Sequence, residues 1–346
     1  MRQMRQAIDD LKLDLGGAIV LTEAANGPYV VTPIIPALAG AETVYAFTRN
    51  TRFGTADEVS GHTQGLARAA GCLGRLRVIT ELGQDVAGQA DIVTNSGHLR
   101  PLSRERIGWL KAGAVIPLMY EAWEFRRGDL DLDACRARGI PVAGTDEAHR
   151  AIGVRNYLGM AVVRQLLSCP VPVWGSRLLL LCDNPFAPHI AQTLRACGAS
   201  VLVDGTLDPQ RWRSDERFDA VVVAMRPRER KIVGGGQALV EVGRVVEACP
   251  DGPVIQFWGD IDRQALAAAG VPYLPRRAPA RGHMGGLLSE LGTVPVIRLQ
   301  AGGCKVGEVL WRAMKATGDC GQALRAVRAS GYGQPVEDVP GGESKR

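Results

Sequence analysis

A histidine and an arginine stand in one short polar loop, Asn95-Ser96-Gly97-His98-Leu99-Arg100, which follows a predicted strand at 90–95. Ligands of parallel α/β sheets bind at the carboxyl ends of the strands. The loop therefore faces the expected crevice, where His98 could exchange protons and Arg100 could hold an anion. A loop that only caps the fold explains the same residues, and both interpretations remain open.

Two acids and a tryptophan follow the next predicted strand, 113–119, in the stretch Tyr120-Glu121-Ala122-Trp123-Glu124. Glu121 and Glu124 are three positions apart, so on a helical turn both carboxylates lie on one face. We predict Glu121 and Glu124 as candidate catalytic acids and Trp123 as a substrate contact, in a site for an amine or a peptide. The alternative is a charged loop over a buried Trp123.

Two further groups of candidates stand at strand ends. Arg49 and Arg52 close and follow the predicted strand at 43–50, where arginines can accept the 2′-phosphate of NADP. A surface turn with two solvated arginines is the alternative. The turn at 22–29, after the first predicted strand, has no glycine fingerprint, and Asn26 within it is a candidate substrate contact.

The composition is that of a globular protein. Apolar residues make up 46% of the 346 residues, and no apolar run approaches the length of a membrane span. The amino-terminal residues lack the apolar core of a signal peptide, so we expect a cytoplasmic protein. The net charge of +5 is spread along the chain, and no nucleic-acid-binding motif is present. The densest basic run, 226–231, is either a solvated loop or an anion-binding segment.

The eight cysteines form no C-x-x-C pair and stand mostly in apolar contexts. This pattern indicates buried, reduced thiols and argues against a metal site.

Strands and helices alternate from about residue 17 to 275, which predicts parallel sheets covered by helices. We therefore predict an α/β protein with two doubly wound Rossmann- or flavodoxin-like domains. The expected order is a first domain at 1–147, an interdomain helix and linker at 148–172, a second domain at 173–278, helices at 279–330 that return to the first domain, and a mobile tail at 331–346. Helices are expected at 27–40 and 148–167, and glycines are expected to break the returning segment into helical pieces.

Residues 178–205, LLLLCDNPFAPHIAQTLRACGASVLVDG, have the outline of a dinucleotide-binding unit: a strand, a turn, a helix, a second strand and an acid. The turn at 182–188 contains no glycine. Pro185 and Pro188 remove N–H groups near the helix start, where phosphate oxygens would be held. Asp183 adds a negative charge near the place where a diphosphate would lie.

Four segments resemble the D-2-hydroxyacid dehydrogenase superfamily, to which formate and glycerate dehydrogenases belong. They are DLDACRARGIPVAGT at 131–145, VRNYLGMAVVRQLL at 154–167, the unit at 176–205 and DIDRQALAAAGVPYLP at 260–275. In addition, residues 90–116 are similar to the late strands of nucleotide-binding domains in dehydrogenases and in adenosylhomocysteinase. This second similarity implies that Asn95, Ser96 and Gly97 lie beside a cofactor.

The superfamily resemblance implies an NAD(P) cofactor, with Asp204 as the acid that binds the ribose. Asn184 falls on the position of the second turn glycine and is a further candidate for cofactor contact, whereas an Asp-Gly turn explains Asp204 equally well. His283 corresponds to the family's catalytic histidine. The family's catalytic arginine falls on or near Phe257, so the grip for a 2-keto carboxylate is missing. A homodimer is implied as well.

Two functions remain open at this point. We favour a dehydrogenase-like protein that lacks standard NAD-dependent hydride transfer and binds a small metabolite or peptide in its interdomain cleft. It would act in a biosynthetic pathway as a non-redox tailoring enzyme or as a partner subunit, in a homodimer or a heteromer. The alternative is a genuine NAD(P)-dependent oxidoreductase of the 2-hydroxyacid dehydrogenase type. The cofactor stays unassigned, with NAD(P) as the candidate.

Overall fold

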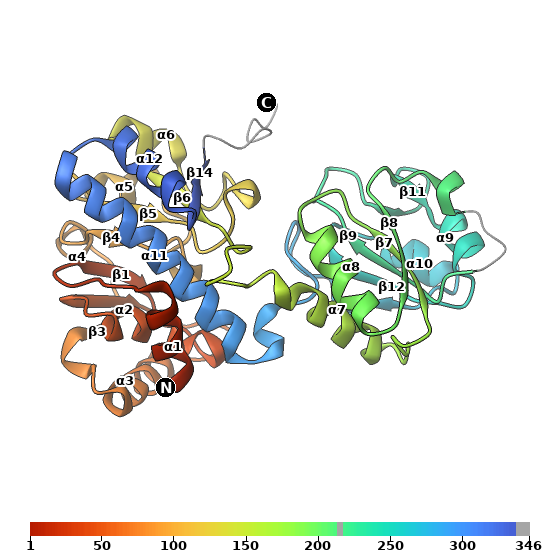
Figure 1. The fold of residues 1–346 in the computed structure, drawn as a ribbon, viewed down its shortest axis with the longest axis horizontal. Coiled ribbons are helices and arrows are strands. Elements are labelled where there is room, and N and C mark those ends of the chain that lie inside the picture. Colours follow the sequence, from red (N-terminus) through yellow and green to blue (C-terminus); the bar gives the residue numbers. More distant parts are fainter. Residues whose placement is uncertain (213–216, 337–346) are drawn as a thin grey trace. The chain divides into compact units, whose positions relative to one another are not determined.

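The structure is a computed structural model that describes residues 1–212 and 217–336. The chain divides into two compact units (Figure 1): unit 1 consists of Met1–Val154 with Gly292–Arg346, and unit 2 consists of Arg155–Leu291. Each unit is built on a parallel sheet with helices around it. The predicted fold class, two doubly wound α/β domains with carboxyl-terminal helices returning to the first, is confirmed.

The sheet of unit 1 is parallel except at its last strand. Its strands are β1 (Ile19–Glu23), β2 (Thr43–Phe47), β3 (Leu76–Ile79), β4 (Ile92–Val93), β5 (Ile116–Pro117), β6 (Val142–Thr145) and β14 (Gly333–Pro335). β14 pairs antiparallel with β6, and single parallel bridges from Ile92 to Val115 and from Asn95 to Leu118 join β4 to β5. The parallel strands thus follow the order β3-β2-β1-β4-β5-β6, as in dinucleotide-binding sheets. The order reverses between β1 and β4, which makes this pair the topological switch point.

Helices and short 3-10 turns connect these strands. They are α1 (Arg2–Leu11), η1 (Gly27–Val31), α2 (Ile34–Leu38), α3 (Ala56–Ala70), η2 (Leu73–Arg75), α4 (Gln84–Ala87), η3 (Gly97–Leu99), α5 (Arg104–Trp109), η4 (Ala122–Glu124), α6 (Leu132–Ala137), α11 (Thr293–Thr317) and α12 (Cys320–Ser330). Residues of α4, α5 and α6 pack with the sheet in one buried apolar cluster. The helix α3 begins with a capping box between Thr55 and Glu58 and ends at Gly71 in a left-handed conformation.

α11 is one continuous helix of 25 residues, so the predicted break at its glycines is wrong. The glycines instead let the helix lie close to the sheet. A Cβ at Gly307 would lie 2.8 Å from Ile92 Cγ2, and a Cβ at Gly302 would lie 2.9 Å from Ile152 Cδ1. Tertiary packing therefore outweighs the low helix propensity of glycine here.

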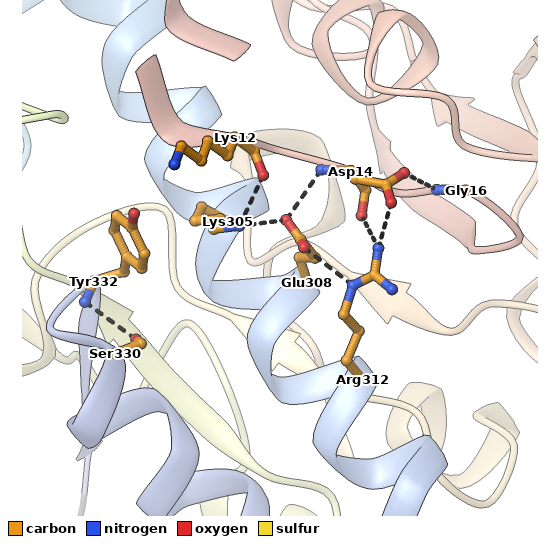
Figure 2. A network of polar contacts seen from close by, with 8 residues as sticks. All are labelled: Lys12, Asp14, Gly16, Lys305, Glu308, Arg312, Ser330 and Tyr332. Atoms are coloured by element: carbon orange, nitrogen blue, oxygen red, sulfur yellow. Dashed lines mark hydrogen bonds and ion pairs between the residues drawn. The ribbon is translucent and has the colours of Figure 1, made fainter. Parts of the chain in front are cut away.

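A partly buried ion network attaches the segment after α1 to α11 (Figure 2). Glu308 accepts hydrogen bonds from Lys305 Nζ at 2.8 Å, from Arg312 Nε at 3.0 Å and from the Asp14 amide at 3.1 Å. Lys305 also donates to the Lys12 carbonyl at 3.0 Å, and Arg312 pairs with the Asp14 carboxylate at 2.7 Å. Each buried charge thus has a partner of opposite sign.

Unit 2 has a parallel sheet in the order β13-β12-β9-β7-β8. Its strands are β7 (Arg177–Leu181), β8 (Ser200–Asp204), β9 (Ala220–Ala224), β12 (Val254–Trp258) and β13 (Tyr273–Leu274), with a separate pair β10 (Val233–Gly234) and β11 (Val240–Glu241). Its helical segments are α7 (Asn156–Ser168), α8 (Phe186–Ala196), η5 (Pro209–Trp212), α9 (Val242–Ala248), α10 (Arg263–Ala268) and η6 (Leu288–Leu291). In chain order this is the 2-1-3-4-5 arrangement of flavodoxin-like folds, with its switch point between β7 and β9.

Three local predictions differ from the structure. The segment 27–40 forms η1 and α2 rather than one helix, because Pro28, Pro33 and Pro36 each lack an N–H donor. The helix predicted from 148 begins at Asn156, after Gly153 at φ +63°. Residues 333–335 of the predicted mobile tail form β14, while 337–346 lie outside the described residues.

The boundaries of the two units also differ from the predicted domain boundaries. Unit 2 begins at Arg155, within the predicted interdomain helix, and extends to Leu291. Residues 279–291, expected with the returning helices, therefore belong to unit 2, and the return to unit 1 begins at Gly292.

Candidate functional site

The switch point of unit 1 brings together a buried glutamate and a histidine. Glu23 is the last residue of β1, and His98 lies in η3, directly after β4. The His98 amide donates a hydrogen bond of 2.8 Å to Glu23 Oε2. A Cβ at Gly97 would lie 2.8 Å from the same oxygen, so a side chain at this position would displace the Glu23 carboxylate. Glu23 is only 5% exposed, which places its carboxylate inside the edge of the sheet.

The imidazole of His98 lies between opposite charges. Burial lowers the pKa of His98, the negative charge of Glu23 raises it in part, and the positive charge of Arg49 lowers it further. His98 Nδ1 is buried and has no hydrogen-bond partner among the described residues. A neutral imidazole at pH 7 can accept or relay a proton, as acid–base chemistry requires.

Tyr29 of η1 lies near the same carboxylate. Burial raises the pKa of the Tyr29 hydroxyl, the charges of Glu23 and Glu147 raise it further, and the charge of Arg100 opposes them. The hydroxyl therefore stays protonated and can donate a hydrogen bond. Glu147, like Glu23, is 5% exposed. The site thus combines two buried acids, a neutral histidine and a phenol.

Hydroxyl groups support the two strands from inside. Thr22 Oγ1 and Thr94 Oγ1 lie 2.7 Å apart, and Thr94 Oγ1 lies 3.0 Å from Ser96 Oγ. Ser96 is 2% exposed. Of the residues predicted to contact a cofactor, Ser96 thus belongs to the scaffold, whereas Gly97 is exposed at the surface.

Arg100 and Asn95 hold each other. Arg100 Nε donates to Asn95 Oδ1 at 3.1 Å, and Arg100 Nη2 donates to the Asn95 carbonyl at 2.7 Å. The guanidinium also lies 4.9 Å from the centre of the Tyr120 ring and 3.7 Å from Asp129. Asn95, predicted as a cofactor contact, is completely buried and donates to the Tyr120 hydroxyl at 3.1 Å. The guanidinium predicted to hold an anion is therefore engaged in fixing the loop.

The two acids after β5 differ in burial. Glu121 is 2% exposed, and its carboxylate accepts hydrogen bonds from the Glu147 amide at 3.0 Å and from Trp123 Nε1. Glu124 ends the 3-10 turn and is partly exposed. Glu121 thus anchors the loop to the segment after β6, and its indole partner Trp123 is also engaged there.

The remaining candidates of unit 1 lie at the rim. Arg49 and Arg52 are exposed, and the Arg52 guanidinium lies 4.7 Å from the centre of the Phe53 ring. Asn26 donates to the Phe53 carbonyl at 2.8 Å, and its Oδ1 lies 3.2 Å from His62 Nδ1. Asn26 therefore holds the loop after β2, while Arg49 is the basic residue whose charge reaches His98.

In unit 2, the backbone amides at the start of α8 donate to Asn184 in the turn after β7. The Phe186 amide donates to Asn184 Oδ1 at 3.0 Å, and the Ala187 amide donates to the Asn184 carbonyl at 3.2 Å. Pro188 has no N–H. Asn184 Nδ2 in turn donates to the Ala224 carbonyl at 2.6 Å, which ties the turn to β9. The first turn of α8 therefore presents no unused amide of these three residues.

Asp183 bridges the switch point of unit 2. Its Oδ1 accepts from the Arg226 amide at 2.8 Å, and its Oδ2 accepts from Arg228 Nη2 at 2.8 Å. A carboxylate paired with the loop after β9 thus stands where the ends of β7 and β9 diverge. Arg228, in the basic run, is engaged in this bridge, which gives part of the run a structural role.

No protein-family model and no curated protein sequence matches this chain. Among solved structures it is similar to one component of dipicolinate synthase from Bacillus halodurans, the A subunit, at 12% identity over 83% of this chain and 96% of that chain, with a TM-score of 0.53. The corresponding dipicolinate synthase component from Bacillus subtilis is 12% identical over 92% of this chain and 99% of its own, with a TM-score of 0.49. A D-isomer specific 2-hydroxyacid dehydrogenase from Lactobacillus delbrueckii ssp. bulgaricus is 12% identical over 87% and 98%, with a TM-score of 0.47.

The chain shares its α/β fold with the Bacillus halodurans protein. The likeness to the Bacillus halodurans protein, the one of these three above a TM-score of 0.5, carries this conclusion, and at 12% identity it concerns the fold alone. The predicted resemblance to the D-2-hydroxyacid dehydrogenase superfamily is confirmed at that level.

In unit 2, Asp204 stands at the end of β8 and is completely buried. Its two oxygens accept hydrogen bonds from Thr206, Asp208, Arg211 and Trp212. Burial alone would raise the pKa of Asp204, but these hydrogen bonds outweigh it and lower the pKa. A ribose hydroxyl would have to displace donors that already organise the loop after β8.

His283 stands in a loop at the end of β12. Trp258 Nε1 donates to the Gly282 carbonyl at 3.0 Å, and the Gly285 amide donates to the Phe257 carbonyl at 2.8 Å. His283 is exposed. Arg263 follows β12 on α10, and its Nη2 donates to Gln256 Oε1 at 2.5 Å and to the Pro275 carbonyl at 3.2 Å. Arg263, the first arginine after Phe257 in the sequence, thus holds β12 and β13 together.

The described residues include no group of three metal-binding side chains, and no disulfide joins any of the eight cysteines, all of which lie among them. Burial raises the pKa of the Cys182 thiol to about 12, so this thiol stays protonated. In the part of the chain that the structure describes, no helix is both long enough and apolar enough to span a membrane.

Sequence reasoning missed Glu23 and Tyr29. The available signal was an acid at the end of the apolar strand IVLTE, at the carboxyl edge where ligands bind. It could not show that Glu23 lies beside His98, because the two residues are 75 positions apart.

Proposed function

We propose that this chain is a dehydrogenase-shaped protein that binds a small metabolite or peptide at the carboxyl edge of the sheet of unit 1. His98 serves there as the acid–base group, with Glu23 and Tyr29 as its polar neighbours. The protein works without standard NAD-dependent hydride transfer, as a non-redox tailoring enzyme or as a partner subunit in a biosynthetic pathway. A protein of this fold from Bacillus halodurans is one component of a synthase, which agrees with the second role.

One observation carries the proposal: a neutral histidine and a nearly buried carboxylate meet at the topological switch point of unit 1. Open α/β sheets bind ligands at this point, because the connections diverge to opposite faces and leave the strand ends uncovered. Titratable groups with shifted pKa values are common at functional sites, because burial and nearby charges there adjust the pKa to the task of the group. The homodimer or heteromer remains a prediction.

The contacts of unit 2 argue against a dinucleotide at the turn 182–188. The amides of Phe186 and Ala187 are already bonded to Asn184, so they do not face a phosphate. The carboxylate of Asp183 also opposes a diphosphate charge. At about 5 Å and an effective dielectric near 20, two like charges repel by about 3 kcal/mol. The Arg228 partner offsets part of this repulsion but is itself half exposed.

The second candidate is an NAD(P)-dependent oxidoreductase. The strand order of unit 1 favours it, because this order is that of dinucleotide-binding domains. Arg49 and Arg52 stand after β2, where a 2′-phosphate is held in such domains. The first turn after β1 lacks the glycines, however, and the buried Glu23 stands where the diphosphate would approach.

A thermal-shift titration with NAD, NADH, NADP and NADPH separates the two candidates. A ligand at 100 times its dissociation constant stabilises a protein by about 2.7 kcal/mol. We expect no shift with any of the four for the wild type. A saturable shift with one nucleotide would overturn our preferred function, and its loss in Asp204→Ala or in Arg52→Ala would then show which unit holds the cofactor.

A further inference from the structure

We infer that the ligand of unit 1 carries a protonated amine, that Glu23 is the group that binds it, and that the ligand belongs to the amino acids or small peptides. The inference rests on the proposed function and names the class of molecule for the same site. It starts from the charge of Glu23, which the fold leaves uncompensated.

Glu23 differs from two other buried carboxylates, those of Asp204 and Glu308. Asp204 accepts hydrogen bonds from the side chains of Arg211 and Trp212. Glu308 forms ion pairs with Lys305 and Arg312. Glu23 is 5% exposed and has one hydrogen bond, from the His98 amide. Among the described residues it has no lysine, arginine or histidine side chain within ion-pair distance. A buried carboxylate without a counter-charge is costly, so such a group is expected to meet a cation from outside.

The surroundings favour an organic cation over a metal ion. The described residues hold no cluster of three potential metal ligands. Tyr29, whose hydroxyl feels the charges of Glu23 and Glu147, adds an aromatic ring and a hydrogen-bonding oxygen in η1, the turn that follows β1. Ammonium groups bind well between a carboxylate and an aromatic ring. A neutral hydroxyl could share a hydrogen bond with Glu23 but would leave its charge uncompensated.

Arg49 supplies an opposite charge that also reaches His98. Its side chain is exposed at the end of β2, and its charge lowers the pKa of His98 while that of Glu23 raises it. A ligand that carries an ammonium and a carboxylate therefore meets complementary charges at Glu23 and Arg49, with the imidazole near both. Amino acids and small peptides have this pair of groups.

Matched amino acids and hydroxy acids test the inference directly. The probes are L- and D-alanine, L- and D-phenylalanine, the dipeptide Ala-Ala, and the 2-hydroxy acids lactate and phenyllactate, in which the amine is replaced by a hydroxyl. Binding to the full chain is measured by calorimetry and thermal shift for the wild type, Glu23→Gln and His98→Gln. Glu81→Gln is the control, because Glu81 is an exposed acid just after β3.

We expect at least one amine probe to bind the wild type and its hydroxy counterpart to bind far more weakly. Glu23→Gln should weaken the amine probe by about 30-fold or more, as for loss of one partner of a buried charge pair. Glu81→Gln should leave it unchanged. Since the amide removes an uncompensated charge, Glu23→Gln should fold with a midpoint of unfolding no lower than that of the wild type.

Each other result overturns the inference. In one such result, amine and hydroxy probes bind equally well, and their binding is unaffected by Glu23→Gln but lost in His98→Gln. This result would reject the amine as the recognised group and would leave the proposed site intact. Binding that neither Glu23→Gln nor His98→Gln affects, or no binding of any probe, would reject the site as well. A Glu23→Gln protein that melts well below the wild type would show that the fold itself compensates the Glu23 charge, which would remove the premise of the inference.

Discussion

At the scale of the residue, the fold lowers the proton affinity of His98 at the candidate site. Burial and the charge of Arg49 lower its pKa against the opposing charge of Glu23. The unfolded chain holds its histidines near a pKa of about 6.5. Between that value and the lower folded pKa, the unfolded state therefore binds more protons than the folded state at this position.

This difference predicts a pH dependence of stability. The contribution of neutral His98 is fully present above the unfolded pKa and is lost as the pH falls from about 6.5 through the folded pKa. We expect the free energy of unfolding of the wild type to decrease relative to that of His98→Gln as the pH falls. Chemical denaturation at several pH values between about 5 and 7.5 measures it.

His62→Gln serves as the control for that series, because the His62 side chain is exposed. A constant difference for His98→Gln across the range would show that the imidazole is not held in its neutral form.

At the scale of the element, the helix α8 begins in a way that suits packing better than phosphate binding. Phe186, its first residue, is completely buried, with its ring centre 6.4 Å from that of Phe257 and 5.6 Å from that of Trp258. Asn184 bonds the first amides and reaches β9. The turn is thus tied to neighbouring strands by the side chains of Asn184 and Phe186. The glycines of a dinucleotide-binding turn have no side chain and could not make these contacts.

The Asp183 bridge should therefore stabilise unit 2. We expect Asp183→Ala to lower the free energy of unfolding by about 1–2 kcal/mol, because it removes two hydrogen bonds to a carboxylate that is mostly buried. The value lies at the low end for charged groups, since Arg228 is half exposed and screened by water. Denaturant titration of both proteins measures the change.

Asp133→Ala provides the matched comparison, because Asp133 and Arg136 form an exposed pair within one helix. Loss of that pair should cost less than about 0.5 kcal/mol. A similar small effect for Asp183→Ala would mean that the bridge contributes nothing to the fold, and that the carboxylate is free to be displaced by a ligand.

At the scale of the whole molecule, the two units are separate compact bodies, and the chain passes from unit 1 to unit 2 and back. Unit 1 is completed only by α11, α12 and β14 from the end of the chain. The ion network around Glu308 joins α11 to the segment after α1 (Figure 2). The two ends of the sequence therefore stabilise the same unit.

Loss of the Glu308 charge should destabilise unit 1 in particular. We expect Glu308→Gln to lower its free energy of unfolding by about 3 kcal/mol, because Lys305 would remain buried without its carboxylate. Calorimetry should show a lowered transition for unit 1. Arg244→Gln, which removes an exposed pair with Glu247 in unit 2, should leave both transitions nearly unchanged. Equal effects of the two variants would contradict this assignment.

The sequence predicted the fold class and the strands that carry the candidate loops, because apolar runs of strand length alternate with helical segments. It placed His98 at a strand end correctly in unit 1. It did not predict that Arg100, Glu121 and Asn26 would be engaged in holding loops. Their partners are Asn95, Glu147 and Phe53, and no local pattern shows which polar side chain will find a partner within the fold.

The sequence by itself determined that this chain folds as two α/β domains and that its turn after β7 lacks the glycines of a dinucleotide site. Only the tertiary structure decided that Glu23 and His98 lie together, although 75 positions separate them. The physical reason is the strand order: β4 pairs beside β1, not beside β3, its predecessor in the chain. Which strands become neighbours depends on the packing of the whole sheet, and that packing places an uncompensated carboxylate beside a neutral histidine.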